Sequence, residues 1–222
     1  MKVMLFGATG MVGQGVLREC LAADDVEHVL SVGRTSTGAT ASRLRELVLS
    51  DLFDLAGHET EISGYDACFF CLGVSSTGMD EASYIRMTFD LTLSIATLLS
   101  RLNPRMTFIY VSGVGTDESE KGRSMWARVK GRTENEIRKL PFKAAYMFRP
   151  AAILPVNGER SKVQALNSFY AATSWLLGPL RGLMGGYVLT TEDVGRAMLN
   201  VARTGWNKPV LEPADIRKAS TP

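Results

Sequence analysis

The feature that most constrains the fold is a glycine-rich turn near the amino end of the chain. The segment MLFGATGMVGQG places Gly7, Gly10 and Gly13 directly after a short apolar run and before a segment with helical periodicity. In a dinucleotide-binding unit the first glycine permits a tight turn, the second lets backbone approach a pyrophosphate, and the third lets helix pack on strand. The free N–H groups of the helix's first turn then face the phosphates. The sequence therefore predicts a dinucleotide site, against the alternative of a turn that is only rich in glycine.

The composition is that of an ordinary globular protein and excludes several functional classes. The 222 residues suffice for one sizeable core and are few for two full domains. A net charge of +2 gives no basis for binding nucleic acid. The longest uncharged run, 163–180, carries polar residues and ends in a Gly-Pro break, so no membrane span is expected. The amino end runs into glycines rather than a signal-peptide cleavage site, and the cytoplasm is the expected location.

Short apolar runs alternate with amphipathic segments along the chain. Strands are predicted at 2–6, 28–32, 46–49, 67–72, 106–111 and 144–148, and a last short one in KPVLEP. Helices are predicted at 11–22, 80–101, 122–139, near 162–180 and at 191–204. This alternation predicts an α/β fold, a doubly wound parallel sheet with helices on both faces. We expect one domain over 1–222, with a dinucleotide-binding part at 1–150 and a small helical extension at 151–222 on the substrate side.

The three cysteines include the spacing CFFC, at Cys68 and Cys71. This spacing occurs in redox pairs and zinc sites. On a strand, however, an odd offset puts the two side chains on opposite faces. Only two histidines are present to complete a metal site. The prediction is that the cysteines are core residues and that no metal is bound.

The end of the second predicted strand indicates which dinucleotide binds. The segment HVLSVGRTSTG offers Arg34 and a Thr-Ser-Thr run, with no acid where an NAD site holds the ribose hydroxyls. A guanidinium binds a 2′-phosphate through two hydrogen bonds, whereas a carboxylate would repel it. We therefore predict NADP (as NADPH), with NAD the less favoured cofactor. The alternative is that Arg34 is a solvated surface residue.

Several motifs together resemble the atypical branch of the short-chain dehydrogenase/reductase superfamily. They are GATGMVG, the strand end at Arg34, CFFCLGVSS, the strand end YVSG, VKGRTENEI and FRPAAIL. Within that branch they look most similar to the Tat-interacting oxidoreductase group and to related small bacterial NAD(P)H-binding, epimerase-like proteins. The resemblance covers residues 1–155 well and the remainder more loosely. It implies a Rossmann fold and an oxidoreductase activity.

The resemblance also implies roles for residues beyond the three glycines. Asp51 would bind the adenine, or else would only cap the turn that follows it. Ser112 matches the active-site serine. Lys130 matches the lysine that holds the nicotinamide ribose, although a solvated helix lysine is the alternative. The remaining cofactor positions lie in the glycine loop, on the adenosine side and after the sixth strand: Thr9, Met11, Val12, Cys71, Leu72, Gly73, Arg149 and Pro150.

One position departs from the family pattern. In that pattern a tyrosine lies four residues before the lysine, on the same helix face, and gives a proton to the developing alkoxide. Trp126 stands there in this chain. An indole N–H donates a hydrogen bond but does not ionise usefully. The departure removes the general acid and leaves the cofactor positions in place.

Three interpretations of this departure stay open. In the first, the protein is a reductase whose proton comes from Tyr170, from Tyr84, or from a water held by Ser112 and Lys130. In the second, it is a cofactor-binding regulator or redox sensor that acts through a protein partner. In the third, Trp126 is a core residue.

The substrate side is expected within 151–190, beyond the carboxyl ends of the strands. Tyr170 and Trp126 would face a small, mostly apolar carbonyl or quinone-like molecule. The same apolar residues could instead pack the extension or form a homodimer contact: Phe169, Tyr170, Trp175, Leu176 and Leu177.

Overall fold

The computed structural model describes residues 1–159 and 187–221, and its central element is a seven-stranded sheet in which every neighbouring pair is parallel. The strands are β1 (Lys2–Phe6), β2 (His28–Gly33), β3 (Leu44–Val48), β4 (Ala67–Phe70), β5 (Thr107–Val111), β6 (Ala144–Phe148) and β9 (Val210–Leu211). Their order is β3-β2-β1-β4-β5-β6-β9. The chain winds outward from β1 in both directions, so the predicted doubly wound sheet is confirmed. The change of direction lies between β1 and β4, where ligands bind in such sheets.

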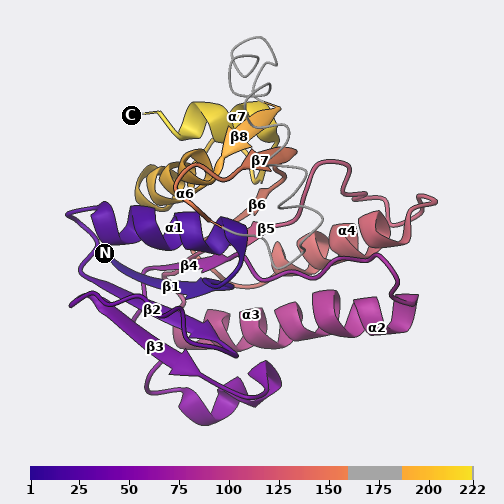
Figure 1. Ribbon diagram of the computed structural model, residues 1–222. Helices are drawn as coiled ribbons and strands as arrows, with labels where there is room; N and C mark the ends of the chain where they lie inside the picture. Colours follow the sequence, from indigo (N-terminus) through magenta and orange to yellow (C-terminus); the bar gives the residue numbers. More distant parts are fainter. Residues whose placement is uncertain (160–186, 222) are drawn as a thin grey trace.

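Helices cover both faces of the sheet (Figure 1). One face carries α1 (Met11–Ala22), α6 (Thr191–Thr204) and α7 (Pro213–Ala219). The other carries α2 (Glu81–Ile85), α3 (Leu91–Leu102), α4 (Met125–Ile137) and the short 3-10 helix η1 (Leu52–His58). The two layers of helices account for the nearly continuous apolar character of the strands.

Alternation along β1 divides the core into two clusters. Val3 and Leu5 pack on the side of α1 and α6, and Met4 and Phe6 pack on the side of α3. All four side chains are fully buried. Successive strand residues point to opposite faces, so one apolar strand anchors both layers.

Several element boundaries differ from the sequence prediction. The predicted helix 80–101 is α2, a π-helical turn η2 (Arg86–Asp90) and α3 in succession. The third strand begins two residues earlier than predicted, and helix α4 is shorter at both ends. The fourth strand ends at Phe70 rather than at residue 72, because Cys71 N makes the last bond, to Phe6 O, before the chain leaves the sheet.

A second small sheet and a last helix were absent from the prediction. Strands β7 (Ala152–Leu154) and β8 (Val188–Thr190) pair in parallel, and α7 follows β9. Three-residue strands carry too little periodicity to be seen in sequence. The predicted helix near 162–180 lies outside the described residues.

The cysteines are free thiols, and their placement on the strand matches the prediction. Cys68 lies in the cluster under α3, whereas Cys71 packs against the cluster under α1, so the two face opposite sides. Burial raises the pKa of the Cys20 thiol to about 12 and raises the pKa of the other two as well. None of these thiols is activated as a nucleophile.

Residues 1–159 and 187–221 contain neither a cluster of metal-binding side chains nor a membrane-spanning helix. They hold no group of three or more histidine, cysteine, aspartate or glutamate side chains placed to bind a metal ion. No helix in these ranges has both the length and the apolar character to cross a bilayer.

Candidate functional site

The glycine turn opens onto a cavity of about 530 Å³ at the carboxyl edge of the sheet. The loops that follow β1, β2, β3 and β4 line it, together with Arg86 and Met87 of the η2 turn and Leu91 at the start of α3. Eight of the predicted cofactor residues meet on its wall, namely Gly7, Thr9, Gly10, Arg34, Asp51, Cys71, Leu72 and Gly73. The parallel sheet brings them together because all its strands end at the same edge.

The turn itself has the geometry that the glycines were predicted to provide. Gly7 has a φ of 82°, and a Cβ there would lie 2.7 Å from the carbonyl group of Cys71. A Cβ on Gly13 would lie 2.1 Å from Gly7 O, so α1 touches the turn. The side chains of Met11 and Val12 pack on the core and leave their backbone to face the turn. Helix α1 begins at Gly10 with no side-chain cap and no acid in its first turn, which leaves its N–H groups for an anion.

Gly13→Ala is expected to weaken dinucleotide binding at least tenfold and to cost about 1–3 kcal/mol of the free energy of unfolding, as overpacking does. The added methyl would collide with backbone and push α1 away from the turn. Fluorescence titration with NADPH and urea unfolding measure the two effects. Gly57→Ala, where a Cβ meets nothing within 4 Å, is the matched control. Unchanged binding by Gly13→Ala would contradict the assignment of the turn.

Arg34 lies on the cavity with its charge uncompensated. Its side chain is exposed and forms no ion pair with any residue in the described ranges. It also lines a neighbouring cavity of about 310 Å³ together with Gly7 and Thr9. Ser36 and Thr37, which follow it, already bind the carboxylate of Glu46. Among the residues of this loop, Arg34 is therefore the one suited to bind an anion.

Asp51 caps the turn that follows it and also lies on the cavity wall, and its predicted contact with adenine stays a prediction. Its Oδ1 accepts a hydrogen bond from Phe53 N at 3.0 Å and caps η1. Its side chain also belongs to the cavity wall. The cap holds the carboxylate at the cavity and leaves Oδ2 without a bond to the described residues.

Trp126 and Lys130 lie on one face of α4, as their spacing predicts. Lys130 Nζ donates to the carbonyl oxygen of Ser112, just after β5, at 2.7 Å. Trp126 is half-buried, and its ring lies 3.5 Å from where a Cβ on Gly115 would be. In the described part of the chain, Trp126 belongs to neither core cluster. The indole therefore packs on the loop after β5, beside Lys130.

The hydroxyl of Ser112 is turned into the protein. Ser112 Oγ donates to Glu134 Oε1, with the carbonyl oxygen of Phe148 3.2 Å away as a second acceptor. Glu134 is fully buried and was not singled out in the sequence. The proton of Ser112 is thus held by acceptors within the protein.

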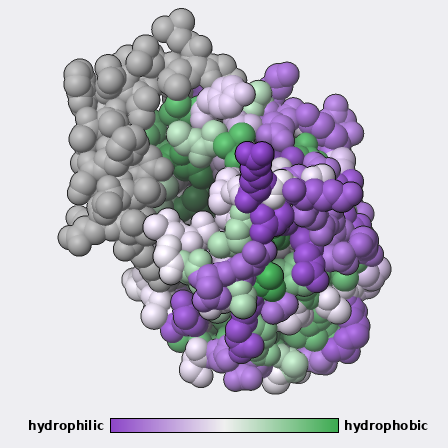
Figure 2. Space-filling model, turned by 90° about the vertical axis from the view of Figure 1, so that its right-hand side faces the viewer, coloured by the Kyte–Doolittle hydropathy of each residue, from purple (hydrophilic) through white to green (hydrophobic). Residues whose placement is uncertain are grey.

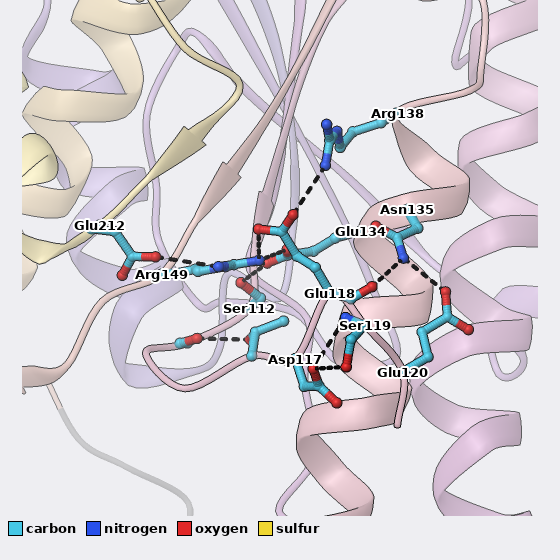
Figure 3. Close-up of polar contacts among 12 residues, drawn as sticks. Ser112, Asp117, Glu118, Ser119, Glu120, Glu134, Asn135, Arg138, Arg149 and Glu212 are labelled. Carbon is cyan, nitrogen blue, oxygen red and sulfur yellow. Dashed lines mark hydrogen bonds and ion pairs between the residues drawn. The ribbon is translucent and has the colours of Figure 1, made fainter. Parts of the chain in front are cut away.

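Arg149 is the centre of a buried ion-pair network (Figure 3). Its Nε lies 3.0 Å from Glu134 Oε1, and its second terminal nitrogen binds the other oxygen of Glu134. Glu118 Oε1 at 2.8 Å and Glu212 Oε1 at 3.2 Å complete the set. Burial by itself lowers the pKa of the guanidinium, but the bonds and charges of the three carboxylates outweigh it and raise the pKa above its usual range.

The guanidinium of Arg149 is therefore engaged within the protein, and its predicted contact with the nicotinamide stays a prediction. Pro150 is buried, and its carbonyl oxygen accepts from Val114 N at 3.0 Å. This bond fixes the loop that follows β5 against the end of β6.

The pKa of the Lys130 ammonium is lower than that of an ordinary lysine. Burial lowers its pKa to about 8, and the negative charge of Glu134 partly opposes this shift. The ring of Tyr110 lies beneath it, with Nζ 5.9 Å from the ring centroid. A lysine with a pKa this close to neutrality can exchange a proton under ordinary conditions.

Of the two tyrosines predicted as alternative proton donors, only Tyr84 lies within the described residues. Tyr84 is 1% exposed, and burial raises the pKa of its phenol. Tyr170 lies outside the described residues, as do the other aromatic and leucine residues expected on the substrate side.

One sequence signal would have located Glu134. Trp126, Lys130 and Glu134 are spaced four residues apart on one helix, so they share a face. An acid on that face, in line with two site residues, is a candidate for the same site. Phe53 and Arg86 on the cavity wall had no comparable signal, because they come from two segments that only the tertiary fold joins.

Comparison with known proteins agrees with this geometry. Residues 3–124, more than half of the chain, match the sequence profile of the NAD dependent epimerase/dehydratase family. The chain belongs to this family. It is 25% identical over 225 residues to "Protein fmp52, mitochondrial" of Emericella nidulans, with 98% of this chain and 93% of that protein covered. It is 26% identical over 205 residues to "Protein HTATIP2" of Rattus norvegicus, with 90% and 80% covered.

Solved structures show the same fold at low sequence identity. The Bordetella bronchiseptica enzyme WbmF in complex with NAD+ superimposes with a TM-score of 0.67 at 17% identity, over 98% of this chain and 76% of that one. UDP-glucuronic acid 4-epimerase from Bacillus cereus, in complex with NAD, gives 0.67 at 14% identity over 95% and 76%. The present chain therefore has the Rossmann fold and belongs to an NAD(P)-binding, epimerase-like family, as the predicted resemblance implied.

Proposed function

We propose that the protein is an NADP(H)-dependent oxidoreductase that acts on a small, mostly apolar carbonyl or quinone-like substrate. The observation that carries the cofactor choice is the position of Arg34, which shares two cavities with the glycine turn. A 2′-phosphate on the adenosine ribose would neutralise this cation. NAD would leave it unused.

The cavity wall suits the rest of the dinucleotide. The α1 N-terminus offers N–H groups to the pyrophosphate. The adenine would lie between the loops after β3 and β4, where Leu72 gives an apolar surface and Asp51 an acceptor. When bound, the cofactor supplies or accepts hydride, and Ser112, Trp126 and Lys130 line the edge where its nicotinamide would lie.

Arg34→Ala is expected to weaken NADPH binding by about 10-fold to 100-fold and to leave NADH binding unchanged, since a hydrogen bond to a charged group contributes about 1.5–3 kcal/mol. Parallel titrations with the two nucleotides measure this. Arg86→Ala is the matched control, because Arg86 lines the same cavity, forms no ion pair with the described residues and packs on Phe53 at 4.9 Å. It should not discriminate between the two nucleotides. Equal weakening of both by Arg34→Ala would refute NADP specificity.

Turnover is tested by mixing purified protein and NADPH with a panel of quinones, aldehydes and ketones and following the loss of NADPH absorbance. Oxidation that disappears with Lys130→Ala supports an oxidoreductase. Tight NADPH binding without oxidation by any member of the panel would instead support a regulator or redox sensor that acts through a protein partner. The absence of a phenol at Trp126 is the observation that keeps this second function under test.

An apolar substrate is supported by the surface of the protein. Figure 2 shows hydrophilic side chains over most of one face and a recess with green, apolar walls beside the grey residues. A cytoplasmic location and a homodimer are also our proposals. The name of the Emericella nidulans relative gives that protein a mitochondrial location.

A further inference from the structure

We propose that Lys130 gives its own proton to the substrate oxygen, and that Glu134 is a positioning residue that holds the Ser112 hydroxyl away from that oxygen. This inference rests on the proposed oxidoreductase function and specifies its proton source. Trp126 supplies no phenol, so the proton has to come from another of the described side chains at this edge of the sheet.

The hydroxyl of Ser112 is not available to donate its proton to the substrate. It has one proton and two acceptors inside the protein, Glu134 Oε1 and the carbonyl oxygen of Phe148 at 3.2 Å. Glu134 is itself fixed, because Arg149 binds both of its oxygens. Ser112 therefore presents lone pairs to a ligand and accepts hydrogen bonds there.

The aromatic side chains near Lys130 cannot act as the proton donor in its place. Tyr110 and Tyr84 are each 1% exposed, and burial raises the pKa of both phenols. Trp126 carries an N–H that does not ionise. Arg149 donates all of its bonds to carboxylates.

Lys130 has N–H groups that no described residue accepts a hydrogen bond from. Its ammonium has three N–H bonds, and Ser112 O accepts one of them at 2.7 Å. No other hydrogen bond from Lys130 to the described residues is present, so two N–H bonds remain. One can hold a ribose hydroxyl while the other faces the substrate oxygen.

The charged and titratable groups around Lys130 come from three directions. Glu134 lies on its own helix, one turn along, and Arg149 at the end of β6 lies on the far side of that carboxylate. Tyr110 of β5 lies beneath Nζ, and Tyr84 of α2 interacts with Tyr110. Glu134 is the neighbour whose charge favours the protonated form of Lys130 and raises its pKa, against the lowering by burial.

The step balances with NADPH as the reductant. Hydride from NADPH forms a C–H bond at the carbonyl carbon, and the electron pair of the C=O bond moves to oxygen. That oxygen forms an O–H bond with a proton from Lys130 Nζ, which keeps its electron pair as a neutral amine. NADP+ and the alcohol are the products, and Lys130 regains a proton from water.

The test combines two readouts on the full-length protein. The first is the pH dependence of NADPH oxidation by an aldehyde or ketone of the panel. It should fall as the pH rises through the Lys130 pKa near 8, because the donor is then lost. The second is the pH dependence of Lys130 acetylation by acetic anhydride, read by mass spectrometry in cofactor-free protein, which should have the same midpoint.

Three variants separate a proton donor from a structural lysine. Lys130→Arg keeps the cation and the cofactor contact but does not deprotonate, so turnover should fall by about 10²-fold or more while NADPH affinity changes little. Glu134→Gln should move both midpoints to lower pH, since the charge that raises the pKa is gone. Glu118→Gln also removes a partner of Arg149 and should leave both midpoints in place.

The outcomes are distinguishable. Midpoints that move together in Glu134→Gln, with loss of turnover in Lys130→Arg, support the proposal. Turnover that survives in Lys130→Arg overturns it, as does a rate midpoint that stays in place while the acetylation midpoint moves. An acetylation midpoint unmoved by Glu134→Gln overturns the coupling between the charge of Glu134 and the ammonium of Lys130. Absence of NADPH binding or oxidation would instead overturn the proposed function, and acetylation of the cofactor-free protein would still report the coupling of Lys130 to Glu134.

Discussion

Arg149→Met is expected to lower the free energy of unfolding by about 3–5 kcal/mol, the loss seen when one partner of a buried ion pair is removed. Arg149 is 7% exposed and Glu134 is fully buried. Without the guanidinium, the carboxylate would keep one partner, the Ser112 hydroxyl, among the described residues. Urea unfolding with an unchanged m-value measures the loss.

Two companion variants identify the cause of that loss. Arg138→Met removes the more exposed pair with Glu118, at 3.6 Å, and should cost less than about 1 kcal/mol. Adding Glu134→Leu to Arg149→Met removes the unpaired charge and should restore most of the stability, because apolar replacement of both partners is often neutral. A small effect of Arg149→Met alone would mean that the network contributes little and that the guanidinium is free to bind a ligand.

Trp126→Tyr is expected to raise carbonyl reduction by up to about 10²-fold, the low end of what a positioned general acid contributes. The new phenol would lie one helical turn before Lys130, whose positive charge lowers the pKa of a neighbouring phenol. The gain stays at the low end because we propose that Lys130 already supplies the proton. Initial rates with an aldehyde, a ketone and a quinone under saturating NADPH measure the change.

Trp126→Phe is the control for the loss of the indole. It opens similar space beside Gly115 without adding a hydroxyl, so its rates should stay near those of the starting protein. A gain by both variants would be a packing effect. No gain by Trp126→Tyr would indicate that this pocket does not bind a carbonyl within reach of position 126.

The cofactor half of the site could be read from the sequence because its signals are local. The glycine turn, Arg34 and Leu72 each follow a strand that the apolar pattern predicts. A parallel sheet brings every such strand end to one edge, so chain order alone assembled most of the cavity wall. Asp51 was found through the family resemblance, although η1 after it was not among the predicted helices.

The catalytic half could be read only in part. Lys130 and Trp126 were found through the family resemblance, which matches the lysine and places Trp126 at the tyrosine position four residues earlier on the same helix face. The direction of the Ser112 hydroxyl and the partners of Arg149 were not found, because Glu118, Glu134 and Glu212 lie 31, 15 and 63 residues from Arg149 in the chain. The small sheet of β7 and β8 was missed because its strands have only three residues each and pair across a wide separation, Ala152 with Val188.

The sequence by itself determined the doubly wound sheet, the glycine turn and the position of Arg34, since these follow from local periodicity and from the order of strands and helices. The family resemblance added the position of Lys130. Only the tertiary structure decided which groups are free to act. Whether a guanidinium, a hydroxyl or an ammonium faces a ligand depends on the buried partners that reach it from distant segments. Among the described residues, Arg34 has no ionic partner, Arg149 is bound by three carboxylates, and two N–H bonds of Lys130 have no acceptor.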